Sequence, residues 1–587
     1  MMTTARSLVA RADSIGRAVW LCAAWCLITL PAAHSAAQAS DAPNRVEPRW
    51  ILCGHQQTAL RAAVARAGGT ISHDLSILDG VAAQLSRDAV DALRAQGVAT
   101  CAVPDRAVHA TVEPDDAAES GHAVDVRDKP ALTRTAHNGI IAVDALHASG
   151  IRGRGVTVAV VDTGLWPALE LTYTASARRR LLAQYDALTD HVVASGHDAA
   201  VHSDANGHGT HVTSVLLNSW RRLNGTFVGM APDADLVSVR AFDADGNSTY
   251  ADVLRGLSWI LDHHATYGIR VVNLSFSAKV ISHYWDDPLN RAVMRLWQAG
   301  LVVVTSAGNQ GPDPFSIGVP GNVPYVITVG AVDLGADRHR DNDDAIALFS
   351  AAGPTVEAFV KPDLVAPGTD MLGLLPRNSQ LAEQFPDLYV SWRYARLSGT
   401  SQATAVISGI AALILQMHPA LTPDALKCHL LAGARPLIDP AGEPAASLFR
   451  QGAGLVNAAR AAFDAPPRCA HLALDVAADL DGSAHRRGPA RDWLASNDAW
   501  LIVPDDQRFD WDGIPQMRWG AWTALDSWVD LDIWIDLDIW VDLDIWVDLD
   551  IWVDLDIWVD DVTIVQPSRI SIAPLDPDSG MPLILRR

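Results

Sequence analysis

Residues 156–164 read VTVAVVDTG, an apolar run that ends in a carboxylate and a glycine turn. Unbroken apolar runs of this length are typical of parallel strands that are buried on both faces. Open α/β sheets place their functional groups at the carboxyl ends of such strands, which is where Asp162 lies. Similar runs recur at Val271–Leu274 and Leu301–Val304, with helical stretches between them. The chain is therefore predicted to form an α/β domain with a mostly parallel sheet and helices on both faces.

Two further glycine-containing segments supply a histidine and a serine. Residues 206–211 read NGHGTH, and residues 398–403 read SGTSQA. We expect each segment to turn into a helix, over roughly 208–217 and 401–416. A serine at a helix N-terminus lies among backbone N–H groups that can stabilise a developing oxyanion.

Ser401, His208 and Asp162 are the candidates for a nucleophile, its base and the carboxylate that orients the base. Their order along the chain, Asp then His then Ser, resembles that of the subtilisin-like serine proteases, or subtilases. The segment 302–311, VVVTSAGNQG, is similar to the subtilase strand whose asparagine donates a hydrogen bond to the oxyanion, which assigns that role to Asn309. The resemblance implies a serine endopeptidase that needs no cofactor for catalysis.

Each motif also has a simpler interpretation. Asp162-Thr163-Gly164 could be an ordinary turn, and Ser401 could be the N-cap of a core helix. His208 and His211, with His202 as a third ligand, could bind zinc, although no glutamate follows the first histidine as in the common metalloprotease motif. In the subtilases only the first histidine of this motif is catalytic, so the resemblance implies a structural role for His211.

The resemblance also assigns a substrate site, at the edges of two strands. The pocket for the residue before the scissile bond would be lined by Ser275, Phe276, Ser277, Ser306, Ala307 and Gly308. Asn247–Thr249 lies where the family has its second substrate-binding edge, and an extended peptide would pair its backbone with both. Ser277 stands where glycine is usual and could narrow the pocket, and no fixed charge marks its floor. We expect a broad preference for apolar or aromatic residues.

One departure from the family follows the nucleophile. The common run after the serine is Met-Ala-x-Pro-His, whereas residues 402–406 read QATAV. The change affects the packing of the helix behind Ser401 and the shape of the leaving-group side, and it leaves the reaction class unchanged.

The N-terminus has the pattern of a signal peptide over residues 1–39. Three arginines precede the uncharged run 18–30, and Ala37-Gln38-Ala39 is a suitable cleavage site. Thirteen apolar residues are few for a membrane span, although an uncleaved anchor is the alternative. We expect a secreted protein, located outside the cell, in the periplasm or at the cell surface, with no membrane span after signal removal.

Residues 46–110 resemble the inhibitor propeptide of the subtilases, with a small α+β, ferredoxin-like fold. The resemblance implies that this region templates folding, blocks the active site with its C-terminal end and is released by self-cleavage within the linker 111–135. The simpler alternative is a generic small domain that stays attached.

Signal removal would leave four cysteines, Cys53, Cys101, Cys428 and Cys469, which allow three pairings. Their locations favour Cys53 with Cys101 and Cys428 with Cys469. In a ferredoxin-like sheet the first and last strands are neighbours, so Cys53 and Cys101 could bridge them.

The remaining sequence divides into a peptidase domain over 136–465, a spacer over 466–521, a repeat region over 522–561 and a C-terminal segment over 562–587. Tryptophan recurs every six residues from Trp522 to Trp558, in the unit WVDLDI, and the thirteen aspartates of 526–561 have no Lys or Arg among them. A period of six fits strands and not helices. The region is predicted to be β-type or disordered, and either a calcium-loaded adhesive module or a solubilising tail.

The net charge of −23 argues against a nucleic-acid partner, because phosphate binding requires a basic face. The expected partners are protein or peptide substrates and the chain's own propeptide. Structural calcium is compatible with the family, but its ligands cannot be assigned from these residues. The second function considered is a catalytically inactive subtilase scaffold that presents the repeat tail for adhesion or calcium binding.

Overall fold

The computed structural model describes residues 47–110, 137–193, 204–334, 344–438, 444–464 and 474–488, together with the backbone of two strands, β18 (Ile570–Leu575) and β19 (Pro582–Arg586). These two strands pair antiparallel. The predicted signal peptide, the linker 111–135 and the repeats of 522–561 lie outside the described residues. We call 47–110 the N-terminal unit and the described residues of 137–488 the main domain.

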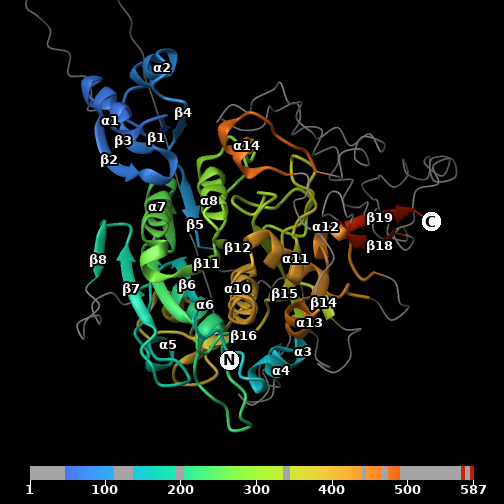
Figure 1. Cartoon of the computed structure of the whole chain (residues 1–587). Helices are drawn as coiled ribbons and strands as arrows, with labels where there is room; N and C mark the ends of the chain where they lie inside the picture. The colour runs from blue at the N-terminus through green and yellow to red at the C-terminus, as the bar shows by residue number, and fades with distance from the viewer. Residues whose placement is uncertain are drawn as a thin grey trace, which may run out of the picture. The chain divides into compact units, whose positions relative to one another are not determined.

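A nine-stranded sheet forms the centre of the main domain (Figure 1). In spatial order its strands are β14 (Asp344–Ile346), β13 (Ile327–Leu334), β12 (Val302–Ser306), β11 (Ile269–Leu274), β6 (Thr157–Asp162), β9 (Asp235–Arg240), β7 (Leu181–Asp186) and β8 (His191–Val193), and β15 (Leu364–Pro367) also pairs with β13. Only the pairs β13–β14 and β7–β8 are antiparallel. Every residue of β6 is buried, as the apolar run predicts.

Helices cover both faces of this sheet. α6 (His208–Leu217) packs with α10 (Thr400–Met417), and α7 (Tyr250–Tyr267) packs with α8 (Pro288–Gln298); each pair contacts the central strands. The other helices of the main domain are α3 (His137–Ile140), α4 (Val143–Ala148), α5 (Leu169–Thr172), α9 (Gln380–Gln384), α11 (Pro423–Gly433), α12 (Leu448–Gln451), α13 (Ala458–Phe463) and α14 (Val476–Asp481). The predicted α/β architecture, a mostly parallel sheet with helices on both faces, is confirmed.

Local sequence explains where the long helices begin and end. The Thr249 hydroxyl accepts a hydrogen bond from Asp252 N at the start of α7, and Gly268 ends that helix with φ of 62°. Asp287 caps α8 in the same way, with Pro288 at its first position. Among the described residues, α10 alone is long and apolar enough to span a membrane, and it is buried inside the main domain.

The N-terminal unit has the predicted ferredoxin-like α+β fold. Its elements are β1 (Arg49–Cys53), α1 (Gln57–Arg66), β2 (Thr70–Leu75), β3 (Gly80–Gln84), α2 (Arg87–Ala95), β4 (Cys101–Pro104) and β5 (Ala107–His109). The sheet order is β2-β3-β1-β4, which places Cys53 opposite Cys101. The two cysteines form a disulfide, as predicted. Cys428 is also disulfide-bonded, and its partner lies outside the described residues.

Two parts of the main domain differ from the sequence expectation. Residues 170–203 form a polar insertion between Asp162 and His208, which predicts a loop, but residues 181–186 form β7, which extends the parallel sheet beside β9. The packed body also continues past the expected boundary at 465. Asp479 in α14 is 2% exposed and accepts hydrogen bonds from the hydroxyls of Tyr284 (2.9 Å) and Tyr325 (2.5 Å). These buried bonds anchor residues 474–488 to the main domain.

Candidate active site

Asp162 and His208 meet where β6 ends and α6 begins. His208 Nδ1 lies 2.7 Å from Asp162 Oδ1, and the two side chains are 0% and 2% exposed. Because Nδ1 faces the carboxylate, Nε2 is the nitrogen left to exchange a proton with a neighbour, and it is buried with no partner among the described residues. Burial acts to lower the pKa of His208, but the negative charge and hydrogen bond of Asp162 outweigh burial and raise it above the ordinary value of 6.5.

Asp204 fixes the turn that carries His208, and the sequence analysis did not identify it. The side chain is 1% exposed. Its Oδ1 accepts hydrogen bonds from Thr163 Oγ1 and Gly207 N, both at 2.8 Å, and its Oδ2 accepts one from Thr210 N at 2.7 Å. These bonds join the residue after Asp162 to both sides of His208. The charge of Asp204 also raises the pKa of His208.

Ser401 lies in the first turn of α10 and is fully buried. Its Oγ donates to the carbonyl of Ser275 at 3.2 Å, and the Ser275 hydroxyl donates to the carbonyl of Ser401 at 3.1 Å. Asn273 Nδ2 donates to Ser275 Oγ at 2.9 Å, and Ser408 Oγ donates to Asn273 Oδ1 at 2.8 Å. This chain of bonds ties the start of α10 to the end of β11, so the serine is held at the edge of the sheet.

Asn309 follows β12 and faces the same helix N-terminus. Its Oδ1 accepts hydrogen bonds from Thr400 N at 3.0 Å and from Thr400 Oγ1 at 2.7 Å. Fixing the oxygen fixes the direction of the amide nitrogen. Asn309 Nδ2 is buried and has no partner among the described residues. An N–H donor held this way is available to an anion that forms next to Ser401.

The segments predicted to line a substrate pocket are brought together. Ser306 Oγ donates to the carbonyl of Phe276 at 2.9 Å, which joins 275–277 to 306–308. A methyl group built on Gly308 would lie 3.2 Å from Ser277 Oγ, and one built on Gly318 would lie 2.6 Å from it. The Ser277 hydroxyl therefore lies next to both Gly308 and Gly318. Asn247–Thr249 forms β10, which pairs with β5 of the N-terminal unit.

His211 is not part of the Asp162–His208 pair. It is fully buried, its Nε2 is 3.3 Å from the carbonyl of Ala395, and burial lowers its pKa to about 3. The ring is therefore neutral. His202 lies outside the described residues, and the described part of the chain holds no group of three or more His, Cys, Asp or Glu side chains placed to bind a metal. The structure assigns no calcium or zinc ligands.

Comparison with known proteins gives consistent results. The family model described as Peptidase_S8, Subtilase family, matches residues 153–454. Serine protease AprX of Bacillus subtilis (strain 168) is 37% identical over 329 residues, which cover 54% of this chain and 70% of that protein. Subtilisin DY of Bacillus licheniformis is 29% identical over 331 residues, which cover 55% of this chain and 96% of that protein.

A similar fold occurs in the crystal structure of fervidolysin from Fervidobacterium pennivorans, a keratinolytic enzyme related to subtilisin. The TM-score is 0.54 at 22% identity, and the match covers 72% of this chain and 62% of the fervidolysin chain. This likeness supports the fold.

Proposed function

This chain belongs to the subtilase family of serine proteases, and we propose that Asp162, His208 and Ser401 form its catalytic triad. In this mechanism Ser401 Oγ attacks the peptide carbonyl, and His208 Nε2 takes the serine proton and later gives it to the leaving amine. Asp162 holds the ring with Nδ1–H toward its carboxylate. Asn309 Nδ2 and the backbone N–H groups at the start of α10 stabilise the oxyanion. The observation that carries the proposal is the buried 2.7 Å pair with His208 Nε2 left unpartnered.

The test is peptidase activity of matched variants. The chain and its Ser401→Ala variant are secreted from the same host, and hydrolysis of a peptide p-nitroanilide is followed. Ser149→Ala is the control, because Ser149 is exposed and its hydroxyl donates to the carbonyl of Ala145 in its own helical turn. We expect Ser401→Ala to lose all measurable activity and Ser149→Ala to retain it. Full activity of Ser401→Ala would refute the assignment.

The N-terminal unit is proposed to be an inhibitor that occupies the substrate site of its own main domain. β5 pairs antiparallel with β10, and His109 forms an antiparallel bridge with Ser277 on the other side. Ala110 N donates to the carbonyl of Gly246 at 2.9 Å. The end of the unit thus inserts as a strand between the two predicted substrate edges, which is the binding mode expected for an extended peptide.

The register of this strand supports a proposal for the bond that is cut. In an antiparallel pairing the residue numbers of opposed partners have a constant sum, so continuing the register of the His109–Ser277 bridge by two residues leads from Ser277 to Ser275 on the main domain. The carbonyl of Ser275 accepts the hydrogen bond of the Ser401 hydroxyl. The peptide bond that follows residue 111 is therefore the one proposed to reach the nucleophile, and it lies within the predicted processing linker.

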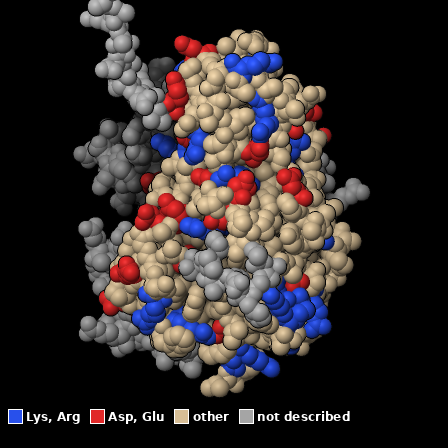
Figure 2. All heavy atoms as spheres, turned by 90° about the vertical axis from the view of Figure 1, so that its left-hand side faces the viewer, with Lys and Arg blue, Asp and Glu red and all other residues tan. Residues whose placement is uncertain are grey.

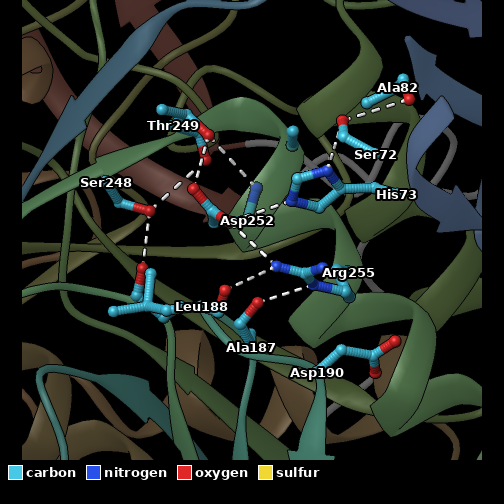
Figure 3. A network of polar contacts seen from close by, with 12 residues as sticks. Ser72, His73, Ala82, Ala187, Leu188, Asp190, Ser248, Thr249, Asp252 and Arg255 are labelled. Carbon is cyan, nitrogen blue, oxygen red and sulfur yellow. Dashed lines mark hydrogen bonds and ion pairs between the residues drawn. The ribbon is translucent and has the colours of Figure 1, made fainter. Parts of the chain in front are cut away.

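A polar network attaches the unit to the start of α7 (Figure 3). His73 Nε2 lies 2.9 Å from Asp252 Oδ1, and Asp252 also accepts hydrogen bonds from Thr249 Oγ1 at 2.7 Å and Arg255 Nη2 at 3.1 Å. Nearby, Asp105 Oδ1 accepts a hydrogen bond from Ala251 N at 3.0 Å and so caps α7 from the N-terminal unit. Acidic and basic side chains are intermingled on the face that carries α7 (Figure 2). The interface also has an apolar part, because Ile77, Leu78 and Val108 of the N-terminal unit belong to the same buried hydrophobic cluster as the core of the main domain.

We also propose that the protein is secreted. A chain with the signal-peptide pattern of residues 1–39 and with disulfides is suited to an oxidising compartment outside the cytoplasm. The Ser277 hydroxyl lies close to Gly308 and Gly318, and we propose that it narrows the floor of the pocket. We therefore propose that small and medium apolar residues are preferred over large aromatic ones before the scissile bond, and a panel of peptide p-nitroanilides with Ala, Leu and Phe at that position tests it.

A further inference from the structure

Gln402, the residue after the nucleophile, is a buried amide in the place where the family commonly has methionine. Its side chain is 1% exposed. Gln402 Nε2 lies 3.4 Å from His211 Nδ1, and Gln402 Oε1 is buried with no partner among the described residues. A buried polar group in a core helix is costly unless it is paired, so its presence behind Ser401 calls for a function.

His211 fixes which way this amide points. The Nε2 of His211 faces the carbonyl of Ala395 at 3.3 Å, and the low pKa keeps the ring neutral. We therefore assign the hydrogen to Nε2, which leaves Nδ1 as an acceptor. An acceptor at Nδ1 requires the NH₂ group of Gln402 on that side, which turns Gln402 Oε1 away from His211.

Gln402 Oε1 faces the same small space as Asn309 Nδ2. A methyl group built on Gly399 would lie 2.8 Å from Gln402 Oε1 and 3.4 Å from Asn309 Nδ2. The absent side chain of Gly399 thus leaves a space bordered by one unpartnered acceptor and one unpartnered donor. Asn309 Nδ2 carries two N–H groups, and an oxyanion can use only one of them well.

We propose that Gln402 is a positioning residue of the oxyanion hole, which holds Asn309 through the second N–H of its amide. Gln402 Oε1 faces the Asn309 amide across the space beside Gly399, and the two close to a hydrogen bond as the oxyanion forms. His211 supports this arrangement by holding the other end of the Gln402 amide. The inference rests on the proposed role of Asn309 as an oxyanion donor.

A double-mutant cycle tests this coupling. Gln402→Met, Asn309→Ala and the double variant are made in the full chain, and kcat and KM are measured on the mature enzymes. We expect Gln402→Met to lower kcat about tenfold with KM unchanged when Asn309 is present, and to have no further effect when Asn309 is alanine. A residue that only packs α10 would cost the same factor in both backgrounds, and that result would overturn the inference.

Two controls keep the result interpretable. Thr404→Val alters the next turn of α10, where the hydroxyl bonds only to the carbonyl of Thr400, and it should leave kcat within twofold. Gln402→Leu provides a second uncharged variant if Gln402→Met does not mature. If Asn309→Ala alone leaves kcat unchanged, Asn309 is not an oxyanion donor, and the proposed role of Gln402 is refuted as well. If Asn309→Ala is impaired and Gln402→Met is not, only the inference is overturned.

Discussion

Replacing Asp204 by asparagine tests whether the turn around His208 is held by a charged side chain. In the aspartate, Oδ1 accepts from Thr163 Oγ1 and Gly207 N, and Oδ2 accepts from Thr210 N. An asparagine can keep its oxygen toward the first two donors, but its NH₂ group then faces the Thr210 N–H. One buried donor is left unpaired, at a cost of about 1–3 kcal/mol.

Two measurable effects follow from this substitution. If the cost appears as misplacement of His208, kcat/KM falls by roughly 5- to 150-fold, because about 1.4 kcal/mol corresponds to a factor of ten. Loss of the Asp204 charge has a second effect, on the pKa of His208. Asp204 raises the pKa of His208, so its removal lowers that pKa, and the acid limb of the kcat/KM profile moves to lower pH.

The assay is the pH dependence of kcat/KM for the wild-type chain and the variant on one peptide substrate, with thermal unfolding measured alongside. Asp387→Asn is the control, because Asp387 is an exposed acid that undergoes the same chemical change. An acid limb that stays in place or moves to higher pH in Asp204→Asn would refute the reasoning. So would an equal shift in the control.

Three further predictions follow from the described contacts. In the wild-type enzyme the raised pKa of His208 should place the acid limb of the kcat/KM profile above pH 6.5, because the histidine must be neutral to act as a base. An acid limb near pH 5 would contradict the pairing of His208 with Asp162. Asp363→Ala should destabilise the main domain by about 3–5 kcal/mol. The Asp363 carboxylate lies 2.6 Å from Lys361 Nζ and 2.8 Å from Lys427 Nζ, so its removal leaves two buried ammonium groups without their carboxylate. Unfolding of the variant in a Ser401→Ala background measures the loss. Replacing Cys53 and Cys101 by serine opens a link across 48 residues and should destabilise the N-terminal unit by roughly 4 kcal/mol. In a Ser401→Ala background, where the unit is retained, this should appear as loss of intact precursor from secreted material, and undiminished precursor would count against it.

The sequence predicted those parts of the molecule that depend on local pattern. The run ending in Asp162 forms a fully buried parallel strand, and the segments with His208 and Ser401 open helices that bring these residues to one end of the sheet. The pairing of Cys53 with Cys101 also followed, because the first and last strands of a ferredoxin-like sheet are neighbours.

Other features depend on contacts that form only in the folded chain. Asp204 acts by accepting hydrogen bonds from backbone groups of a turn, and four residues before His208 it gives no periodic or compositional signal. β7 lies within a polar insertion, and its place beside β9 is decided by backbone pairing and not by hydrophobic alternation. Gln402 was visible only as a departure from the family pattern. Its relation to Asn309 depends on the space beside Gly399.

The central claim is that the N-terminal unit occupies the substrate site and is removed by the chain's own serine. Intact mass and N-terminal sequencing of the secreted wild-type chain and its Ser401→Ala variant test it most directly. We expect a wild-type main domain that begins at residue 112 and a variant that retains residues 47–111. A wild-type chain that keeps the unit, or a variant trimmed at the same bond, would contradict it.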